Sequence, residues 1–228
     1  MCQRTSEVGI DVKPVSAGLA KLLGRMVEDA MPNYPGGLAN AELVKGDPDF
    51  VAEFYNFCNA RAAKRAETLA WQQRPAWKVI TIGTHASKEE LKKAVTDEGH
   101  KFSDWALGLI DTDGFTVETT PRQIGLFTAT VAEIGFSKSA KVKDIYAKLD
   151  ELGYAVCPDE TALQLRRAYL DQPMDEWRRV VTEPKAGSYG FLSVLRVVRG
   201  QDGSWVYSYY AGPGDVWDGD YRLVFCRK

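Results

Sequence analysis

The stretch FLSVLRVVRGQDGSWVYSYYA, residues 191–211, is the strongest indication of the fold class of this chain. Two runs rich in β-branched and aromatic residues flank the segment RGQDGSW, which contains a tight turn, and this pattern predicts a β-hairpin. Further strands are predicted over 177–184 and 220–228, each separated from the hairpin by turn-forming residues. The carboxy-terminal third therefore reads as an antiparallel β-meander.

The first 74 residues carry the periodicity of helices instead. Apolar side chains recur at helical spacing over 15–31, and a second helix is predicted over 47–73. Asp47 is its expected N-cap, Pro48 takes the first helical position, and Pro75 ends it because a residue before proline avoids the helical conformation. We therefore expect a helical N-terminal segment, 1–74, and a separate α+β domain, 75–228.

Helices and strands alternate between residue 75 and the meander. A capping box of Ser87 and Glu90 starts a helix near residue 88, Gly99 ends it, and Ser103 caps the next short helix. Asp159 is expected to cap a later one. Strands are predicted over 77–83, 115–119 and 124–136, and helices over 102–110, 140–153 and 160–170. The predicted fold class is α+β: a helical segment, then a mixed α/β region that ends in the antiparallel meander.

Composition and charge exclude several classes of protein. The 228 residues are 45% hydrophobic and 26% charged, and a net charge of −2 argues against a dedicated nucleic-acid-binding protein. No apolar run reaches the roughly 20 residues of a membrane helix, and the N-terminus lacks the apolar core of a signal peptide. The four cysteines form no C-x-x-C pair, which favours a reducing cytoplasm over a zinc site or a disulfide-stapled secreted domain.

Aromatic and acidic side chains crowd the last hairpins and form the first candidate ligand-binding surface. Side chains alternate along a strand, so Trp205, Tyr207 and Tyr209 share one face. Trp217 and Tyr221 lie in or beside the following loop, which also contains the aspartates. Ring stacking and carboxylate acceptors suit a sugar or a nucleobase. The bland alternative is a hairpin loop with ordinary strand aromatics and turn chemistry. The residues are Trp205, Tyr207, Tyr209, Asp215, Trp217, Asp220 and Tyr221.

Two further candidate sites involve a loop and a helix. His85 lies in a loop between a predicted strand and a capped helix, a position where strand–helix units bind ligands, although no nucleotide-binding motif is present. Gln164, Arg166 and Tyr169 lie on one predicted helix and could clamp a phosphate or a carboxylate. A solvated loop and an ordinary helix surface, followed by an edge strand at Trp177, are the alternatives.

No cofactor or metal site is predicted. The acidic spacing in the last loop does not match a calcium loop, and two histidines cannot supply a three-histidine site.

From about Lys78 to the end, the chain resembles a family of uncharacterised bacterial proteins. The resemblance rests on VITIGTHASKEELKKA, KFSDWA, TVAEIGF, CPDETALQLRRAYLDQP with the following EW, and YYAGPGDVW with DYRLVF. It implies no activity and no catalytic residue. It does imply that residues 78–228 form a unit that can occur apart from the leading helices.

These observations predict a non-enzymatic binding or interaction protein whose partner is an unknown protein or a small polar ligand. The alternative is a hydrolase-type enzyme that acts on a sugar or nucleotide-like ligand through the carboxylates near Trp217, assisted by His85. A nucleic-acid-associated regulator is a third hypothesis, and it requires the arginines to gather on one face.

Overall fold

The computed structural model describes residues 48–188 and 190–228, and the chain divides into two compact units, Met1–Ala66 and Glu67–Lys228. Helix α2 (Pro48–Gln72) agrees with the helix predicted over 47–73. The helix predicted over 15–31 and the Asp47 cap lie outside the described residues. In the described part of the chain, no helix combines the length and the apolar character needed to cross a bilayer.

The second unit is built on a mixed sheet in which the described residues form nine strands. Its main path runs in the order β1-β3-β11-β6-β8-β9-β2, with β5 beside β11 and β7 beside β8. The strands are β1 (Lys78–Ile82), β2 (Lys101–Phe102), β3 (Arg122–Thr130), β5 (Tyr154–Ala155), β6 (Trp177–Val180), β7 (Lys185–Ala186), β8 (Leu192–Gly200), β9 (Gly203–Tyr210) and β11 (Arg222–Arg227). A second, two-stranded sheet pairs β4 (Ser139–Lys141) with β10 (Val216–Asp218).

The predicted hairpin is confirmed, but the strand order departs from a simple meander. Gly200 pairs with Gly203, so β8 and β9 are joined by a tight two-residue loop, and β6, β8 and β9 are antiparallel neighbours. The last strand, β11, then returns to lie parallel to β6 and antiparallel to β3. As a result β6 lies in the interior of the sheet, and the prediction of an edge strand at Trp177 is wrong.

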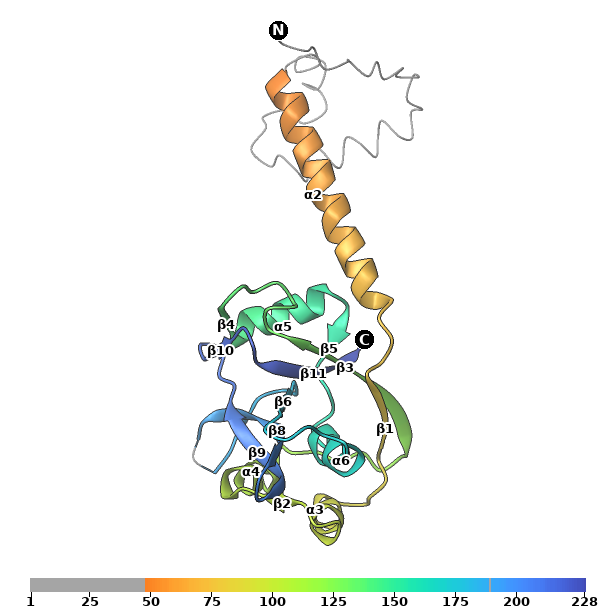
Figure 1. The fold of residues 1–228 in the computed structure, drawn as a ribbon, viewed down its shortest axis with the longest axis vertical. Helices are drawn as coiled ribbons and strands as arrows, with labels where there is room; N and C mark the ends of the chain where they lie inside the picture. The colour runs from red at the N-terminus through yellow and green to blue at the C-terminus, as the bar shows by residue number, and fades with distance from the viewer. Residues whose placement is uncertain (1–47, 189) are drawn as a thin grey trace. The chain divides into compact units, whose positions relative to one another are not determined.

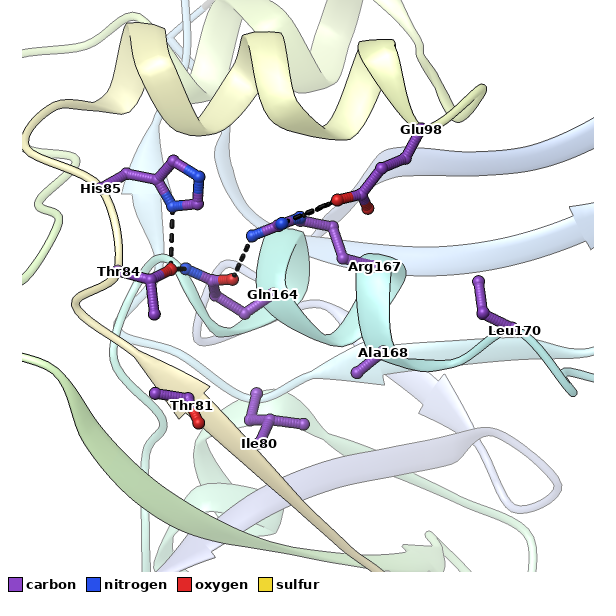
Figure 2. A pocket seen from close by; sticks show the side chains of 9 residues that line it. All are labelled: Ile80, Thr81, Thr84, His85, Glu98, Gln164, Arg167, Ala168 and Leu170. Carbon is purple, nitrogen blue, oxygen red and sulfur yellow. Dashed lines mark hydrogen bonds and ion pairs between the residues drawn. The ribbon is translucent and has the colours of Figure 1, made fainter.

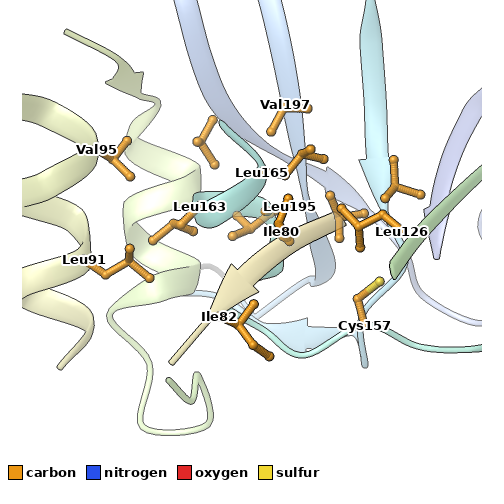
Figure 3. Packing of buried hydrophobic residues seen from close by; sticks show 14 of the residues in the cluster. Ile80, Ile82, Leu91, Val95, Leu126, Cys157, Leu163, Leu165, Leu195 and Val197 are labelled. Carbon is orange, nitrogen blue, oxygen red and sulfur yellow. The ribbon is translucent and has the colours of Figure 1, made fainter. Parts of the chain in front are cut away.

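Two hydrophobic cores cover the two faces of the sheet, because successive side chains of the central strands point to opposite sides. Along β11, Val224 and Cys226 belong to one core, and Leu223 and Phe225 to the other. The first core packs beneath α3, α4 and α6, and Figure 3 shows its side chains meeting from helices and strands. The second lies beneath α5 and the small sheet, on the other side of β3 and β11 (Figure 1).

Local capping determines where the helices of this unit begin. Helix α3 (Lys88–Asp97) starts after Ser87, whose hydroxyl accepts from the amide of Glu90, and α4 (Asp104–Ile110) starts after Ser103 in the same way. Both predicted caps are therefore confirmed. The remaining helices are α5 (Val142–Glu151) and α6 (Thr161–Ala168).

Three local predictions around α6 and β3 are wrong for physical reasons. Residues 115–119 form no strand, because buried carboxylates bind the backbone amides of Thr116 and Glu118. Asp159 does not cap α6, since its carboxylate accepts from Thr116 and pairs with Lys185 at 3.1 Å. The strand predicted over 124–136 stops at Thr130, where Thr130 and Glu133 bond each other's backbone amides and start a turn.

Candidate functional site

The predicted aromatic and acidic residues do not form one surface. The Trp217 side chain is 0% exposed and belongs to the second core, where its indole nitrogen donates to the carbonyl of Tyr210 at 2.9 Å. Asp215 accepts from the amide of Gly212 at 2.7 Å and closes the turn before β10. Trp205 and Tyr207 of β9 pack on each other with ring centroids 5.3 Å apart. Trp217 thus offers no ring face to a ligand.

Three of these residues, Tyr209, Asp220 and Tyr221, do line a common cleft of about 600 Å³. We call it the arginine–aromatic cleft. The volume lies within the range of small-molecule sites. The cleft lies where β6, β8 and β9 meet the segment before β11. Its other lining residues are Pro173, Met174, Asp175, Glu176, Trp177, Arg179, Arg196 and Arg222.

Two arginines, Arg179 and Arg196, give the cleft its cationic character, and neither was predicted as a site residue from the sequence. The guanidinium carbon of Arg179 lies 4.3 Å from the ring centroid of Tyr209 and 3.4 Å from that of Tyr221. The guanidinium carbon of Arg196 lies 4.4 Å from the ring of Trp177 and 4.8 Å from that of Tyr209. Both cations are therefore within cation–π distance of the aromatic walls.

The strand register places these two cations next to each other. Arg179 of β6 and Arg196 of β8 are directly opposite partners in an antiparallel pair. Burial lowers the pKa of Arg196 to about 10, and repulsion from Arg179 adds to that change. Burial also lowers the pKa of Arg179, although hydrogen bonding with Tyr209 and electrostatic attraction to Tyr209, Tyr221 and Asp220 raise it in part. Both side chains remain cationic at neutral pH, so the cleft holds two adjacent positive charges.

The neighbouring arginine shows what a neutralised side chain looks like in this fold. Arg178 is also buried and also lies over an aromatic ring, 4.3 Å from Trp77. Its guanidinium, however, forms two hydrogen bonds to the carboxylate of Glu176, at 2.6 and 2.8 Å. Among the residues that the structure describes, neither Arg179 nor Arg196 has an ion pair of this kind. Their buried Arg179 Nε, Arg196 Nε and Arg196 Nη1 atoms have no hydrogen-bond partner there.

Two of the other predicted residues, His85 and Gln164, line a separate pocket of about 840 Å³, shown in Figure 2. The Thr84 hydroxyl lies 2.9 Å from Nδ1 of His85, and Gln164 donates to the same hydroxyl oxygen at 3.0 Å. Arg167 donates to Gln164 at 3.1 Å and pairs with Glu98 at 2.7 Å. The polar groups of this pocket thus bond one another in a chain, and none of its lining residues is shared with the arginine–aromatic cleft.

Arg166 and Tyr169 serve the interior of the protein. Arg166 is 0% exposed, and it donates to the side chain of Gln172 and to the carbonyl of Tyr169, the latter at 2.5 Å. The Tyr169 ring packs edge-on against Trp77, and its hydroxyl donates to Glu176 at 2.7 Å. These contacts fix the segment after α6 against the sheet. Arg166 and Tyr169 line neither the cleft nor the pocket around His85, although Arg166 Nε has no hydrogen-bond partner in the described chain.

Within the described residues, no group of three or more His, Cys, Asp or Glu side chains is arranged to hold a metal ion. Comparisons with protein-family models, with curated proteins and with solved structures found no match to the chain. Roles for individual residues therefore rest on the geometry alone.

The sequence does contain a signal for the cleft. Arg178 and Arg179 are consecutive in a strand, so their side chains must point to opposite faces of the sheet. One of the two finds Glu176, two residues earlier, whereas the other lies on the face that carries Tyr209 and Tyr221. Recognising this requires the pairing of β6 with β8, which is not visible in a single sequence.

Proposed function

We propose that this protein binds a small polar ligand in the arginine–aromatic cleft and acts as a non-enzymatic binding protein. The observation that carries the proposal is the pair of adjacent guanidinium groups, Arg179 and Arg196, which line the cleft without a carboxylate ion pair in the described chain. Buried charges are normally paired, so two cationic side chains that line a cleft without a carboxylate partner are groups that an anionic or polar ligand can neutralise.

The exposed ring of Trp177 supports the same proposal. Its side chain is 47% exposed although it lines the cleft, so it offers an apolar platform beside the two cations. Apolar walls with a few convergent polar groups are typical of small-molecule sites. The pocket around His85 is the weaker candidate, because its polar groups already bond one another.

A thermal-shift screen tests the proposal with a panel of nucleotides, nucleosides, sugars and small carboxylates. A ligand at about 100 times its Kd stabilises the fold by about 2.7 kcal/mol, which raises the melting temperature by several degrees. We expect at least one compound to produce this shift in the wild type and to lose it in Trp177→Ala.

The control is Phe191→Ala, because Phe191 is an aromatic residue that is 55% exposed and does not line the cleft. Its melting temperature should respond to the compound as the wild type does. A screen without any shift, or a shift that Trp177→Ala retains in full, would contradict the proposal.

A hydrolase remains the second proposal, on the single observation that Asp220 and Glu176 both line the cleft. Two carboxylates across a cleft are what glycoside hydrolysis requires. The carboxylate of Glu176 already accepts hydrogen bonds from Arg178 and Tyr169, so Asp220 is the carboxylate that this proposal tests. Under this proposal Asp220→Asn abolishes turnover of a bound sugar substrate without lowering stability, whereas unchanged turnover would refute it.

A further inference from the structure

We infer that the ligand of the arginine–aromatic cleft is a small molecule that carries an oxyanion, a phosphate or a carboxylate, held between Arg179 and Arg196. This inference rests on the proposed function and names the chemical class of its ligand. In this arrangement the aromatic residues of the cleft, Trp177, Tyr209 and Tyr221, hold the two guanidinium groups in place as well as contacting the ligand.

The register of the sheet brings two like charges together. Arg179 and Arg196 occupy directly opposite positions in the antiparallel pair of β6 and β8. Like charges at such positions destabilise a sheet. The next position along the same row, Tyr207 of β9, is an aromatic residue without charge. An oxyanion between the two guanidinium groups would turn this repulsion into two attractive contacts.

The protein leaves part of the hydrogen-bonding capacity of both arginines unused. Arg179 is 3% exposed, yet its Nε has no partner among the described residues, and the same holds for Nε and Nη1 of Arg196. A guanidinium presents its donors in a planar fork that matches the oxygens of a phosphate or a carboxylate. Tyr209 and Tyr221 lie within cation–π distance of Arg179, and hydrogen bonding with Tyr209 partly opposes the lowering of its pKa by burial, but neither ring supplies a negative charge that would neutralise the cation.

The acidic residues at the cleft do not remove this capacity. Glu176 is bound by Arg178 at 2.6 Å, and Asp175 and Asp220 are exposed at the rim. Asp220 is close enough to raise the pKa of Arg179, although the two form no ion pair in the described chain. The carboxylate of Asp220 therefore repels an anion that approaches Arg179, and removing its charge should favour anion binding.

Titration calorimetry on the full chain at low salt tests the inference with four probes. Pyrophosphate and citrate represent the two oxyanions, and adenosine and maltose represent uncharged polar ligands. We expect at least one anion to bind, with Arg179→Met and Arg196→Met each weakening it at least tenfold, as expected for loss of a charge-assisted hydrogen bond. Asp220→Asn should tighten binding, and whichever anion binds more strongly identifies the oxyanion.

Arg227→Met is the matched control, because Arg227 also lies over a ring, 4.4 Å from Phe127, but outside the cleft. It should leave the affinity unchanged. Arg196→Lys keeps the charge and loses the fork, so it should weaken binding severalfold in a protein whose circular dichroism is that of the wild type. This variant decides the question if a methionine variant fails to fold.

The outcomes separate the inference from the proposed function. If adenosine or maltose binds in a manner that requires Trp177 while both anions fail, the inference is wrong and the binding function stands. If none of the four probes binds and the wider screen shows no shift, both are wrong. Anion binding of equal strength in the wild type and in the cleft variants would also overturn the inference.

Discussion

Replacing Trp217 with alanine tests whether this residue is part of the core or part of a ligand-binding rim. Its side chain is 0% exposed, its ring lies 6.4 Å from that of Tyr146, and its nitrogen donates to the carbonyl of Tyr210. Removing a buried tryptophan side chain lowers the free energy of unfolding by about 3–5 kcal/mol. About 1 kcal/mol of this loss is the hydrogen bond, so Trp217→Phe should restore most of the stability.

Urea denaturation followed by circular dichroism measures the change, and the adjacent residue of the same strand provides the control. Val216 is 54% exposed, so Val216→Ala should alter the free energy of unfolding by no more than about 0.5 kcal/mol. Similar effects of Trp217→Ala and Val216→Ala would refute a core role for Trp217. Loss of ligand binding in Trp217→Ala without a change in the unfolding midpoint would refute it too.

Two further predictions concern the backbone of β1–α3 and the pH dependence of stability. Gly83 has φ +71°, and a Cβ there would lie 2.2 Å from the carbonyl oxygen of Thr120, whereas Gly99 has φ +82° with no atom within 4 Å of such a Cβ. Gly99→Ala should therefore cost only the left-handed backbone conformation, about 1–2 kcal/mol, and Gly83→Ala should lower the free energy of unfolding in urea by clearly more. Equal losses in the two variants would refute the clash at Gly83. Burial lowers the pKa of His100 below 6.5, with repulsion from Arg166 and Arg167 adding to it and Glu98 opposing it. Below about pH 6.5 the unfolded chain then binds more protons than the folded chain, so the contribution of His100 to stability should be full above that pH and fall as the pH drops to 5. In urea titrations His100→Asn should flatten this pH dependence, and an unchanged slope would refute the role of His100.

Features set by local sequence were predictable. The β8–β9 hairpin forms around its Gln-Asp turn, and Ser87 and Ser103 cap their helices, because each signal lies within a few residues. The turn at Thr130 also had a local signal, the capping pair of Thr130 and Glu133, which the apolar pattern of residues 124–136 concealed.

Features set by distant contacts were not predictable from the pattern. The return of β11 beside β6 and the capture of Thr116 and Glu118 amides by buried carboxylates depend on pairings across the fold. The candidate site follows the same rule. Tyr209, Asp220 and Tyr221 were identified by composition, whereas Arg179 and Arg196 became visible only when the register placed them opposite each other.

A crystal structure of the protein soaked in tungstate, a tetrahedral oxyanion whose metal has a strong anomalous signal, tests directly whether Arg179 and Arg196 form an oxyanion site. We expect an anomalous peak in the arginine–aromatic cleft, within hydrogen-bond distance of both guanidinium groups. The peak should vanish in Arg196→Met crystals. A cleft without a peak, while tungstate occupies sites elsewhere on the molecule, would contradict the claim that these arginines form an oxyanion site.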